Sequence, residues 1–449
     1  MLASLLARYH LAGRQEADCR AAWLAAIEQL RADWASGTHP EIGRLPEYLR
    51  ELPKDQRFEA LQDLIADHLC LTWRTGQGPR LESYLAELSG EFAGLGSPAS
   101  VPADLVDDEF LARHQLPHGD APSLEEYQAR FPARPDVMEL LESRCLEGGR
   151  YVKLHKRGLG AMGEVWEAYD RRLRRLVAIK KPWADLKNNA EALRYFDHEA
   201  RITASLGHPG IISVHDYSQP DDPSPYYVME LINSQTLSER IRDYHQPTIA
   251  RTQAEERLLW NQILQILLSI TNAVSCAHAG GVLHRDLKPG NVLVGEFGEV
   301  VIIDWGMAAR FPSDGASVAG AVAGTPDYMP PEQADGRADV RSDVFGLGAI
   351  LFEILTSRSP HGWTDGARPA DWLSLVRHAE FQPPRHWNAQ TPPALDAICR
   401  KALARETGQR YPTVAALARD IRCYLAGEPV SAQREPAVFK AWRWLRGRR

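Results

Sequence analysis

The sequence has few of the residues that build disulfide frameworks or zinc sites. Its six cysteines are scattered along 449 residues: Cys19, Cys70, Cys145, Cys276, Cys399 and Cys423. None forms a CxxC pair or lies at metal-ligand spacing from a histidine, so a zinc site is not expected. Isolated thiols are typical of proteins from a reducing compartment. This pattern predicts a cytoplasmic protein.

Long apolar runs and a secretory leader are also missing. No stretch approaches the ~18–20 apolar residues that span a bilayer. The N-terminal segment MLASLLARYHLAGRQEAD lacks the basic start and the cleavage site of a signal peptide. We therefore expect the chain as given to be soluble.

Charge is unevenly distributed. The net charge is −7, but residues 1–150 carry 15 Lys and Arg against 25 Asp and Glu, whereas the remainder carries 37 against 34. This asymmetry predicts two units of opposite sign and no nucleic-acid ligand. The chain is long enough for two or three domains, and its hydrophobic fraction of 44% allows sizeable cores.

Three segments near the N-terminus resemble one another: RLPEYLREL (44–52), RLESYLAEL (80–88) and SLEEYQARF (123–131). Each places a leucine three residues before a tyrosine, so both side chains share one helical face. The pattern predicts an all-α, acidic domain over residues 1–145, built from a degenerate helical repeat or from unrelated short amphipathic helices. We expect this domain to regulate the chain or to dock a partner.

From Tyr151 the pattern changes. Short β-rich runs such as RLVAIKK and YYVMEL come first, and long helical periodicities such as residues 255–279 follow. A strand-rich unit followed by a helix-rich unit predicts an α+β arrangement with a cleft between the two.

A strand that turns on Gly158, Gly160 and Gly163 lies near the start of this region. Such glycines let backbone amides approach phosphates, although they also occur in plain hairpins. The run Val-Ala-Ile-Lys ending at Lys180 predicts a buried strand whose ammonium could hold phosphates once a carboxylate orients it. Glu199, in an amphipathic helical stretch, is the candidate carboxylate.

The segment HRDLKPGN (284–291) is far more specific. Asp286 can accept or orient the proton of an attacking hydroxyl. Lys288 can neutralise charge on a transferring phosphate, and Asn291 can offer a neutral oxygen to a metal ion.

Downstream of this segment, residues 291–304 predict a hairpin turned between Gly295 and Gly298. The hairpin would return the chain beside Asn291 and end at Asp304. Because Mg²⁺ prefers oxygen ligands and keeps several waters, one Asp, one Asn and nucleotide phosphates form a suitable shell.

In this order the motifs resemble the protein-kinase superfamily, specifically the bacterial eukaryotic-like (Hanks-type) serine/threonine kinases. The resemblance covers residues 151–425 and implies a bilobal fold, with a small β-rich lobe (151–232) and a large helical lobe (233–425). It implies ATP with Mg²⁺, or Mn²⁺ as an alternative, and transfer of the γ-phosphate to protein Ser or Thr hydroxyls in signalling, with autophosphorylation. The alternatives are an ATP-binding scaffold that acts through the helical domain, and a small-molecule kinase.

The resemblance also implies roles for single residues. Lys180 and Glu199 form the activating ion pair, and Asp286 is the catalytic base. Asn291 and Asp304 hold the metal. The implied nucleotide pocket comprises Gly158, Leu159, Gly160, Gly163, Val165, Ala178, Lys180, Met229, Glu230, Ile232 and Leu293. In it, Met229 is the gatekeeper and residues 230–232 form the hinge.

Further positions follow from the same resemblance. The position of Lys288, two residues after the base, is similar to that of the lysine in serine/threonine kinases. The resemblance also implies that Thr325 hydrogen-bonds near the base. Glu332 pairs with Arg410 below the peptide-binding loop, and Asp343 anchors the catalytic loop. Glu332, Arg410 and Asp343 are structural supports, so we expect their loss to lower stability and activity together.

Arg285 implies an activation loop ordered by a phosphate. The loop offers only Ser313 and Ser317 as acceptors. Trp305 stands where relatives usually have Phe, but this departure does not touch the phosphate or metal shell.

The last segment, residues 426–449, is basic and aromatic. Its aromatic residues Phe439, Trp442 and Trp444 alternate with arginines, a mixture that suits an anionic membrane surface. The alternative is that the aromatic side docks on the large lobe.

Overall fold

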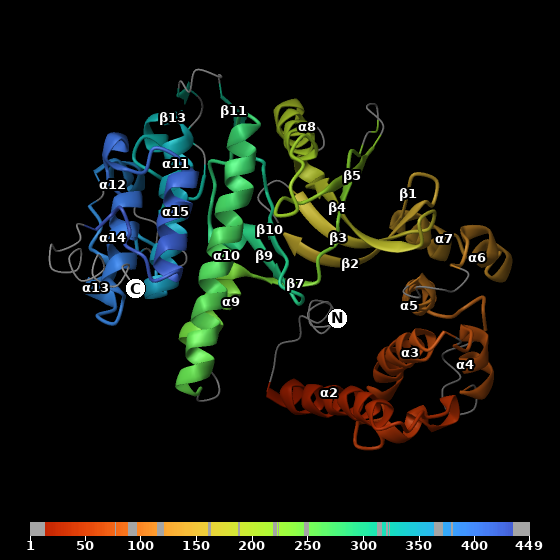
Figure 1. Ribbon diagram of the computed structural model, residues 1–449. Coiled ribbons are helices and arrows are strands. Elements are labelled where there is room, and N and C mark those ends of the chain that lie inside the picture. The colour runs from red at the N-terminus through yellow and green to blue at the C-terminus, as the bar shows by residue number, and fades with distance from the viewer. Residues whose placement is uncertain are drawn as a thin grey trace, which may run out of the picture. The chain divides into compact units, whose positions relative to one another are not determined.

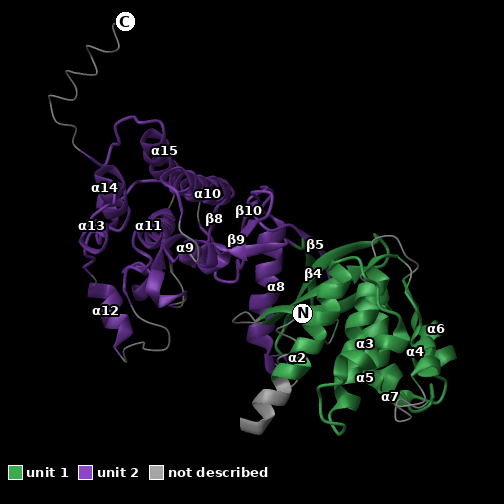
Figure 2. Ribbon diagram, turned by 90° about the horizontal axis from the view of Figure 1, so that it is seen from below, with its two compact units in different colours: residues 1–183, 218–231 green, residues 184–217, 232–449 purple. Residues whose placement is uncertain are grey.

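The computed structural model describes residues 14–76, 78–88, 97–114, 121–159, 163–186, 189–218, 222, 224–246, 251–311, 317–319, 322, 324–362, 371–378 and 380–433. The chain, whose helices and strands are labelled in Figure 1, divides into the two compact units coloured in Figure 2. The first comprises residues 1–183 and 218–231, and the second comprises residues 184–217 and 232–449. Among the described residues, no helix combines the length and the apolar character needed to cross a membrane.

The first unit begins with helices that precede its sheet. They are α2 (Arg14–Ala35), the 3-10 helix η1 (Ile42–Leu49), α3 (Arg57–Arg74), α4 (Leu81–Glu87), α5 (Ala103–His114), α6 (Leu124–Arg130) and α7 (Pro135–Arg144). Local signals set some of their ends. Ser123 caps α6 by accepting from the amide of Glu126, and Pro135 occupies the first turn of α7, where no amide donor is needed.

The three similar N-terminal segments coincide with η1, α4 and α6. Tyr84 and Tyr127 are fully buried in the core of the helical region, whereas Tyr48 is only partly buried and donates to Asp33. Pro46 lies inside η1, and this first segment forms a 3-10 helix instead of the expected α-helix. That the three are copies of one repeat stays a prediction.

The sheet of the first unit is antiparallel. Its strands are β1 (Cys145–Leu146), β2 (Tyr151–Leu159), β3 (Gly163–Asp170), β4 (Arg175–Pro182) and β6 (Tyr227–Met229), in the order β1-β2-β3-β4-β6. Val152 and Leu154 of β2 and Tyr169 of β3 belong to the same hydrophobic core as the N-terminal helices. The helical region and the sheet are therefore one folded body rather than two tethered modules.

The second unit is mostly helical. Its α-helices are α8 (Ala190–Ala204), α9 (Leu237–His245), α10 (Gln253–Ala279), α11 (Val340–Thr356), α12 (Trp372–His378), α13 (Pro384–Trp387), α14 (Pro393–Ala402) and α15 (Val414–Leu425). Its 3-10 helices are η3 (Ala184–Leu186), η4 (Pro289–Asn291), η5 (Pro326–Tyr328), η6 (Gln333–Asp335) and η7 (Thr407–Gln409). Thr252 and Glu255 form a capping box that fixes the start of α10.

Short strands of the second unit position its loops. Strands β7 (Ser234–Thr236), β9 (Val292–Gly295) and β10 (Val300–Ile302) form a sheet in the order β10-β9-β7. Strand β8 (Val282–Leu283) pairs with β11 (Ala309–Arg310), and β12 (Val318–Ala319) pairs with β13 (Arg337–Ala338). Strand β5 (Val214–Tyr217) also belongs to this unit.

The loop between β8 and β9 packs against α11. A Cβ at Gly346 would lie 2.9 Å from the Cβ of Leu287, so a side chain at this position of α11 would push the loop away. The strands and α11 together fix the loop that carries residues 284–291.

Candidate active site

Asp343, at the start of α11, holds the β8–β9 loop through its backbone. Its carboxylate accepts hydrogen bonds from the backbone amides of His284 and Arg285, both at 2.9 Å, and from the Nε2 atom of His278 at 2.7 Å. Burial alone would raise the pKa of Asp343, but the hydrogen bond from His278 and the charges nearby hold it below its usual value. The carboxylate therefore holds the loop as an anion.

Asp286 lies at the centre of this loop and is almost covered. Its Oδ1 atom accepts the amide of Thr325 at 2.6 Å, and its Oδ2 atom lies 3.0 Å from the Nζ atom of Lys288. The Nδ2 atom of Asn291 donates to its carbonyl oxygen at 2.9 Å and to Oδ2 at 3.2 Å. Burial raises the pKa of Asp286, but Lys288 and Thr325 outweigh it and leave the pKa lowered, so the group is ionised.

Lys288 bridges two segments that are far apart in sequence. Besides contacting Asp286, its ammonium donates to Thr325 Oγ1 at 2.6 Å. The loop at Gly324 requires glycine, because its φ is +121° and a Cβ would lie 2.7 Å from Gln333 Nε2 and 3.0 Å from the carbonyl oxygen of Arg285. The loop before η5 is thereby held against the carboxylate of Asp286.

Gln333 and His278 also hold this cluster together, and the sequence did not single them out. Gln333 is 1% exposed and donates to the carbonyl oxygen of Arg285 at 2.7 Å, while His278 binds Asp343. Gln333 directly follows Glu332. Neither Gln333 nor His278 belongs to a spacing pattern that would have indicated its partner.

Asn291 and Asp304 flank the β9–β10 hairpin, at the end opposite its turn. The strands pair Ile302 with Val292, and the amide of Ile303 donates to the carbonyl of Asn291 at 2.9 Å. The hairpin between Gly295 and Gly298 is present as predicted. It brings the residue before Asp304 back to the backbone of Asn291.

These two residues fit a hard divalent cation. The amide nitrogen of Asn291 is engaged by Asp286, which leaves its amide oxygen as the available donor. A Cβ at Gly306 would lie 3.3 Å from both Asp304 Oδ1 and Glu199 Oε2, so a larger residue there would crowd both carboxylates. No group of three or more His, Cys, Asp or Glu ligands is found in the described parts of the chain. One carboxylate and one amide suit Mg²⁺, which keeps waters and takes further oxygens from phosphates.

Lys180 lies in the first unit, on strand β4. It pairs with Val165 and Tyr227 on the neighbouring strands and is only 6% exposed, so the expectation of a buried strand lysine holds. Its ammonium lies 6.0 Å from the centre of the Tyr227 ring. Ala178 pairs with Met229, which aligns these two predicted pocket residues across the sheet.

The glycines of the first unit have different roles. A Cβ at Gly163 would collide with the carbonyl oxygen of Lys181, so the close approach of β3 and β4 requires glycine. A Cβ at Gly158 would meet nothing within 4 Å, which leaves the backbone there accessible. Gly160 and the side chain of Leu159 lie outside the described residues.

The other predicted pocket and ion-pair residues are divided between the units. Glu199, on α8, is 1% exposed and belongs to the second unit, together with Ile232 and Leu293. Val165 and Glu230 belong to the first unit with Lys180. The pairing of Lys180 with Glu199, and a nucleotide pocket formed by both units, stay predictions.

Residues 151–420, which carry this geometry, match the family model described as protein kinase domain. The chain belongs to the protein kinase family. Its small β-rich lobe and helical large lobe follow the expected fold, with the helical region preceding them.

Two of the similar curated proteins are bacterial kinases. It is 36% identical to serine/threonine-protein kinase PknD of Chlamydia muridarum over 302 residues, which cover 62% of this chain and 32% of the relative. It is 35% identical to a probable serine/threonine-protein kinase of Streptomyces coelicolor over 291 residues, which cover 64% and 41%. The kinase therefore spans about a third to two fifths of the length of these relatives.

Two contacts brace the large lobe of the kinase. The ion pair expected between Glu332 and Arg410 is present, with N–O distances of 2.7 and 2.8 Å, and the Arg410 side chain is fully buried. Ser342 of α11 also donates to Glu332 at 2.7 Å. Trp305 is fully buried, and its ring centre lies 4.6 Å from that of His284, so the larger ring is accommodated.

The activation segment of the kinase is described only in part. Ser317 is exposed and directly precedes β12, whereas Ser313 lies outside the described residues. Burial lowers the pKa of Arg285, the arginine that precedes Asp286. The aromatic C-terminal residues Phe439, Trp442 and Trp444 also lie outside the described residues.

Proposed function

We propose that this chain is a serine/threonine protein kinase that transfers the γ-phosphate of ATP to hydroxyl groups of protein substrates. The observation that carries the proposal is the clamped carboxylate of Asp286, held by the amide of Thr325 and the ammonium of Lys288. The names of the curated relatives support the same activity.

The chemistry assigned to these groups is phosphoryl transfer. Asp286 orients the acceptor hydroxyl and takes its proton as the oxygen–phosphorus bond forms and the bond to the ADP leaving group breaks. Lys288 neutralises charge on the phosphoryl oxygens. Asn291 and Asp304 would hold Mg²⁺, which would supply further neutralisation of the phosphates.

We assign the nucleotide to both units. In this proposal Gly158, Gly160 and Gly163 cover the phosphates, and Lys180, oriented by Glu199, contacts them. Val165, Ala178 and Leu293 enclose the adenine. Residues 229–232 meet its edge through backbone groups. The buried strand position of Lys180 and the bare backbone at Gly158 support this assignment.

The acceptor class is assigned from the loop beside the base. Lys288 donates a hydrogen bond to Thr325 beside Asp286, as the resemblance to serine/threonine kinases implied, and this contact supports serine or threonine as the acceptor. Ser313 and Ser317 are the candidate autophosphorylation sites, of which Ser317 is exposed. We further propose a reducing, cytoplasmic setting, since the five cysteines whose side chains the structure describes are free thiols.

We assign the N-terminal helices to regulation or partner docking. Their continuity with the sheet through Val152, Leu154 and Tyr169 supports regulation, because a change in the helices would act on strands of the small lobe.

The test is phosphosite mapping by mass spectrometry after the full chain is incubated with Mg·ATP and a generic protein acceptor. We expect phosphoserine and phosphothreonine, and none with Asp304→Asn as the matched inactive control. ATP binding without transfer by the wild type would favour the scaffold. Transfer confined to tyrosine or to small molecules would refute the assigned substrate class.

A further inference from the structure

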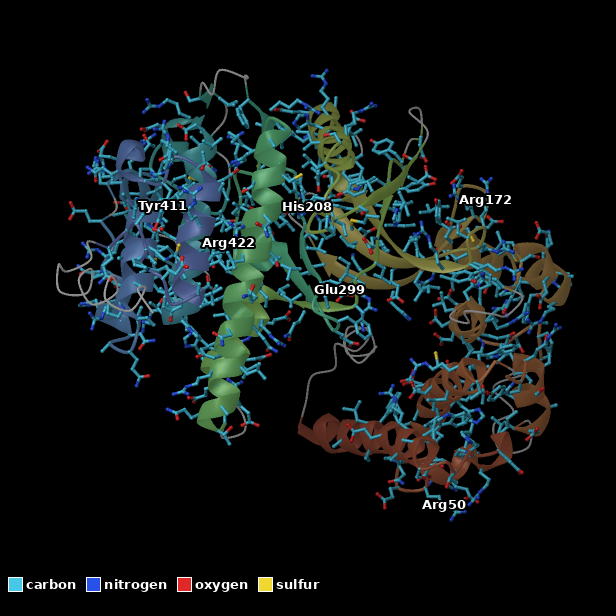
Figure 3. All side chains as sticks on the ribbon, viewed as in Figure 1. Arg50, Arg172, His208, Glu299, Tyr411 and Arg422 are labelled. Atoms are coloured by element: carbon cyan, nitrogen blue, oxygen red, sulfur yellow. The ribbon has the colours of Figure 1, made fainter. Side chains whose placement is uncertain are left out.

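The connection between β3 and β4 is unusually rich in arginine. It reads Asp-Arg-Arg-Leu-Arg-Arg-Leu over residues 170–176, and Arg172, Arg174 and Arg175 are exposed. Figure 3 shows Arg172 close to strand β1 and helix α7. The turn between β1 and β2, which contributes Arg150, faces the same space. All of these residues belong to the first unit.

A pocket of about 550 Å³ lies between these two turns. Its walls include Arg150, Arg171, Arg172, Arg174, Gly148 and Gly149. Both glycines have positive φ, +60° and +86°, and therefore leave bare backbone on one side of the pocket. Four guanidinium groups thus gather around one concavity.

The acidic groups nearby are already engaged. Glu147 pairs with Arg150 at 3.2 Å. Asp170 is 1% exposed and accepts the amides of Arg172 and Leu173 at 2.9 and 3.1 Å, which shapes the turn. Within the described chain, no acidic side chain pairs with Arg171, Arg172 or Arg174. The pocket therefore carries an uncompensated positive charge.

We propose that this pocket binds a peptide segment bearing phosphoserine or phosphothreonine. A guanidinium presents a planar fork of donors that matches phosphate oxygens, and a phosphate monoester carries close to two negative charges at neutral pH. Leu173 and Leu176 do not line the pocket, but they neighbour its arginines in the sequence, and their exposure of 57% and 42% leaves them accessible to apolar residues that flank the phosphate. The site is distinct from the catalytic loop, and its occupancy requires no ATP.

An anionic membrane suits this place less well. Residues 1–150, which supply Ala121 and the turn Glu147–Arg150 to the pocket lining, carry 25 acidic and 15 basic residues. A flat anionic surface would be repelled by these carboxylates, whereas a single narrow segment would enter the pocket past them.

The test is fluorescence anisotropy with the full chain, without ATP. The probe is a labelled peptide with one phosphothreonine between leucines, and its matched forms carry threonine or aspartate. We expect the phosphorylated form to bind about tenfold or more tightly than either. Inorganic phosphate should compete only at much higher concentration.

Two exposed arginines of the same connection provide matched variants. Arg172 lines the pocket and Arg175 does not. Arg172→Gln should weaken binding by about tenfold and Arg175→Gln by less than about threefold. Arg174→Asn should act like Arg172→Gln, since asparagine tolerates the positive φ of +54° at this position. Unchanged thermal unfolding of each variant would exclude a folding defect.

Several results would overturn the proposal. They are equal binding of the aspartate and phosphothreonine peptides, equal effects of Arg172→Gln and Arg175→Gln, or preferential binding to phosphatidylserine vesicles. Phosphoryl transfer is measured separately. If the chain transfers phosphate but does not bind the phosphopeptide, the proposed binding pocket is refuted and the proposed kinase activity is not.

Discussion

The helical region and the catalytic loop both bury charged groups, but they use them differently. In the helical region Glu109, with a fully buried side chain, accepts two hydrogen bonds from Arg130, and Arg130 also binds Glu82 through two bonds. Asp107 is paired with Arg144 in the same way. In the catalytic loop, Asp286 is held by a backbone amide, one ammonium and the amide nitrogen of Asn291, whose amide oxygen stays available.

The difference separates structural from chemical use of charge. Bidentate pairs between arginine and carboxylate occupy most lone pairs and donors, so they hold helices together and leave little for a ligand. Anchoring by backbone amides fixes a carboxylate and still leaves lone pairs for substrate or metal. The predictions below test this distinction.

The largest effect is expected for Asp286→Asn. The amide cannot take the proton of the acceptor hydroxyl, so turnover should fall about 10³-fold. Nucleotide affinity and the free energy of unfolding should stay close to wild type, measured by calorimetry and urea titration. Turnover within tenfold of wild type would remove Asp286 as the base.

Glu109→Gln should chiefly cost stability. It leaves Arg130 without its fully buried carboxylate, and the free energy of unfolding should fall by about 3 kcal/mol. Glu82→Gln is the matched control, because the Glu82 side chain is 39% exposed and should cost about 1 kcal/mol or less. If urea titrations showed the same loss of unfolding free energy for both variants, burial would not be what makes the Glu109–Arg130 pair stabilising.

Leu154→Ala tests the shared core of helices and sheet. Removing a 2%-exposed side chain should lower the free energy of unfolding by about 2 kcal/mol, and the helices and the sheet should still unfold in one transition. Leu173→Ala, at a 57%-exposed position, should change it by less than about 0.5 kcal/mol. Separate transitions for the two parts would show that they are independent modules.

Glu353→Gln should give the smallest effect, and one that depends on pH. Burial raises the pKa of Glu353, against the hydrogen bond from Tyr328. The folded state therefore binds this proton more tightly than the unfolded state, and stability falls as pH rises from about 4.3 through the raised folded-state pKa.

Glutamine at position 353 keeps an acceptor for Tyr328 but does not titrate, so the variant does not lose stability as the pH rises. The variant should be more stable than wild type by about 1 kcal/mol at pH 8, and the gain should shrink at pH 4. Glu380→Gln, at an exposed position, is the control. A constant difference across this range in thermal unfolding would rule out titration of Glu353 as the cause.

Motifs allowed the sequence to predict much of the kinase fold, because phosphate chemistry requires particular residues in a fixed order. The hairpin from Asn291 to Asp304, the buried strand lysine Lys180 and the pair Glu332–Arg410 are present as expected. The hairpin and the buried lysine were readable from residue type and spacing, whereas the Glu332–Arg410 pair was implied by the resemblance to the kinase family.

Other features depend on packing between distant segments and have no local pattern. Gln333 reaches Arg285 across 48 residues, and Arg130 reaches Glu82 over the same separation. The sharing of one core by α5 and β2 was not predicted either, since amphipathic helices do not reveal which surface they cover. Part of the expected glycine loop, at Gly160, lies outside the described residues.

Strand β2 has consequences for how a shortened protein would behave. Its Val152 and Leu154 contact the helices, and the same strand continues to Gly158 within roughly 13 Å of Leu154. A cut at residue 145 would strip apolar cover from this strand and disturb the turn that follows it. Shortened versions that begin at the kinase motifs should therefore aggregate or bind nucleotide poorly for reasons unrelated to any lost inhibition.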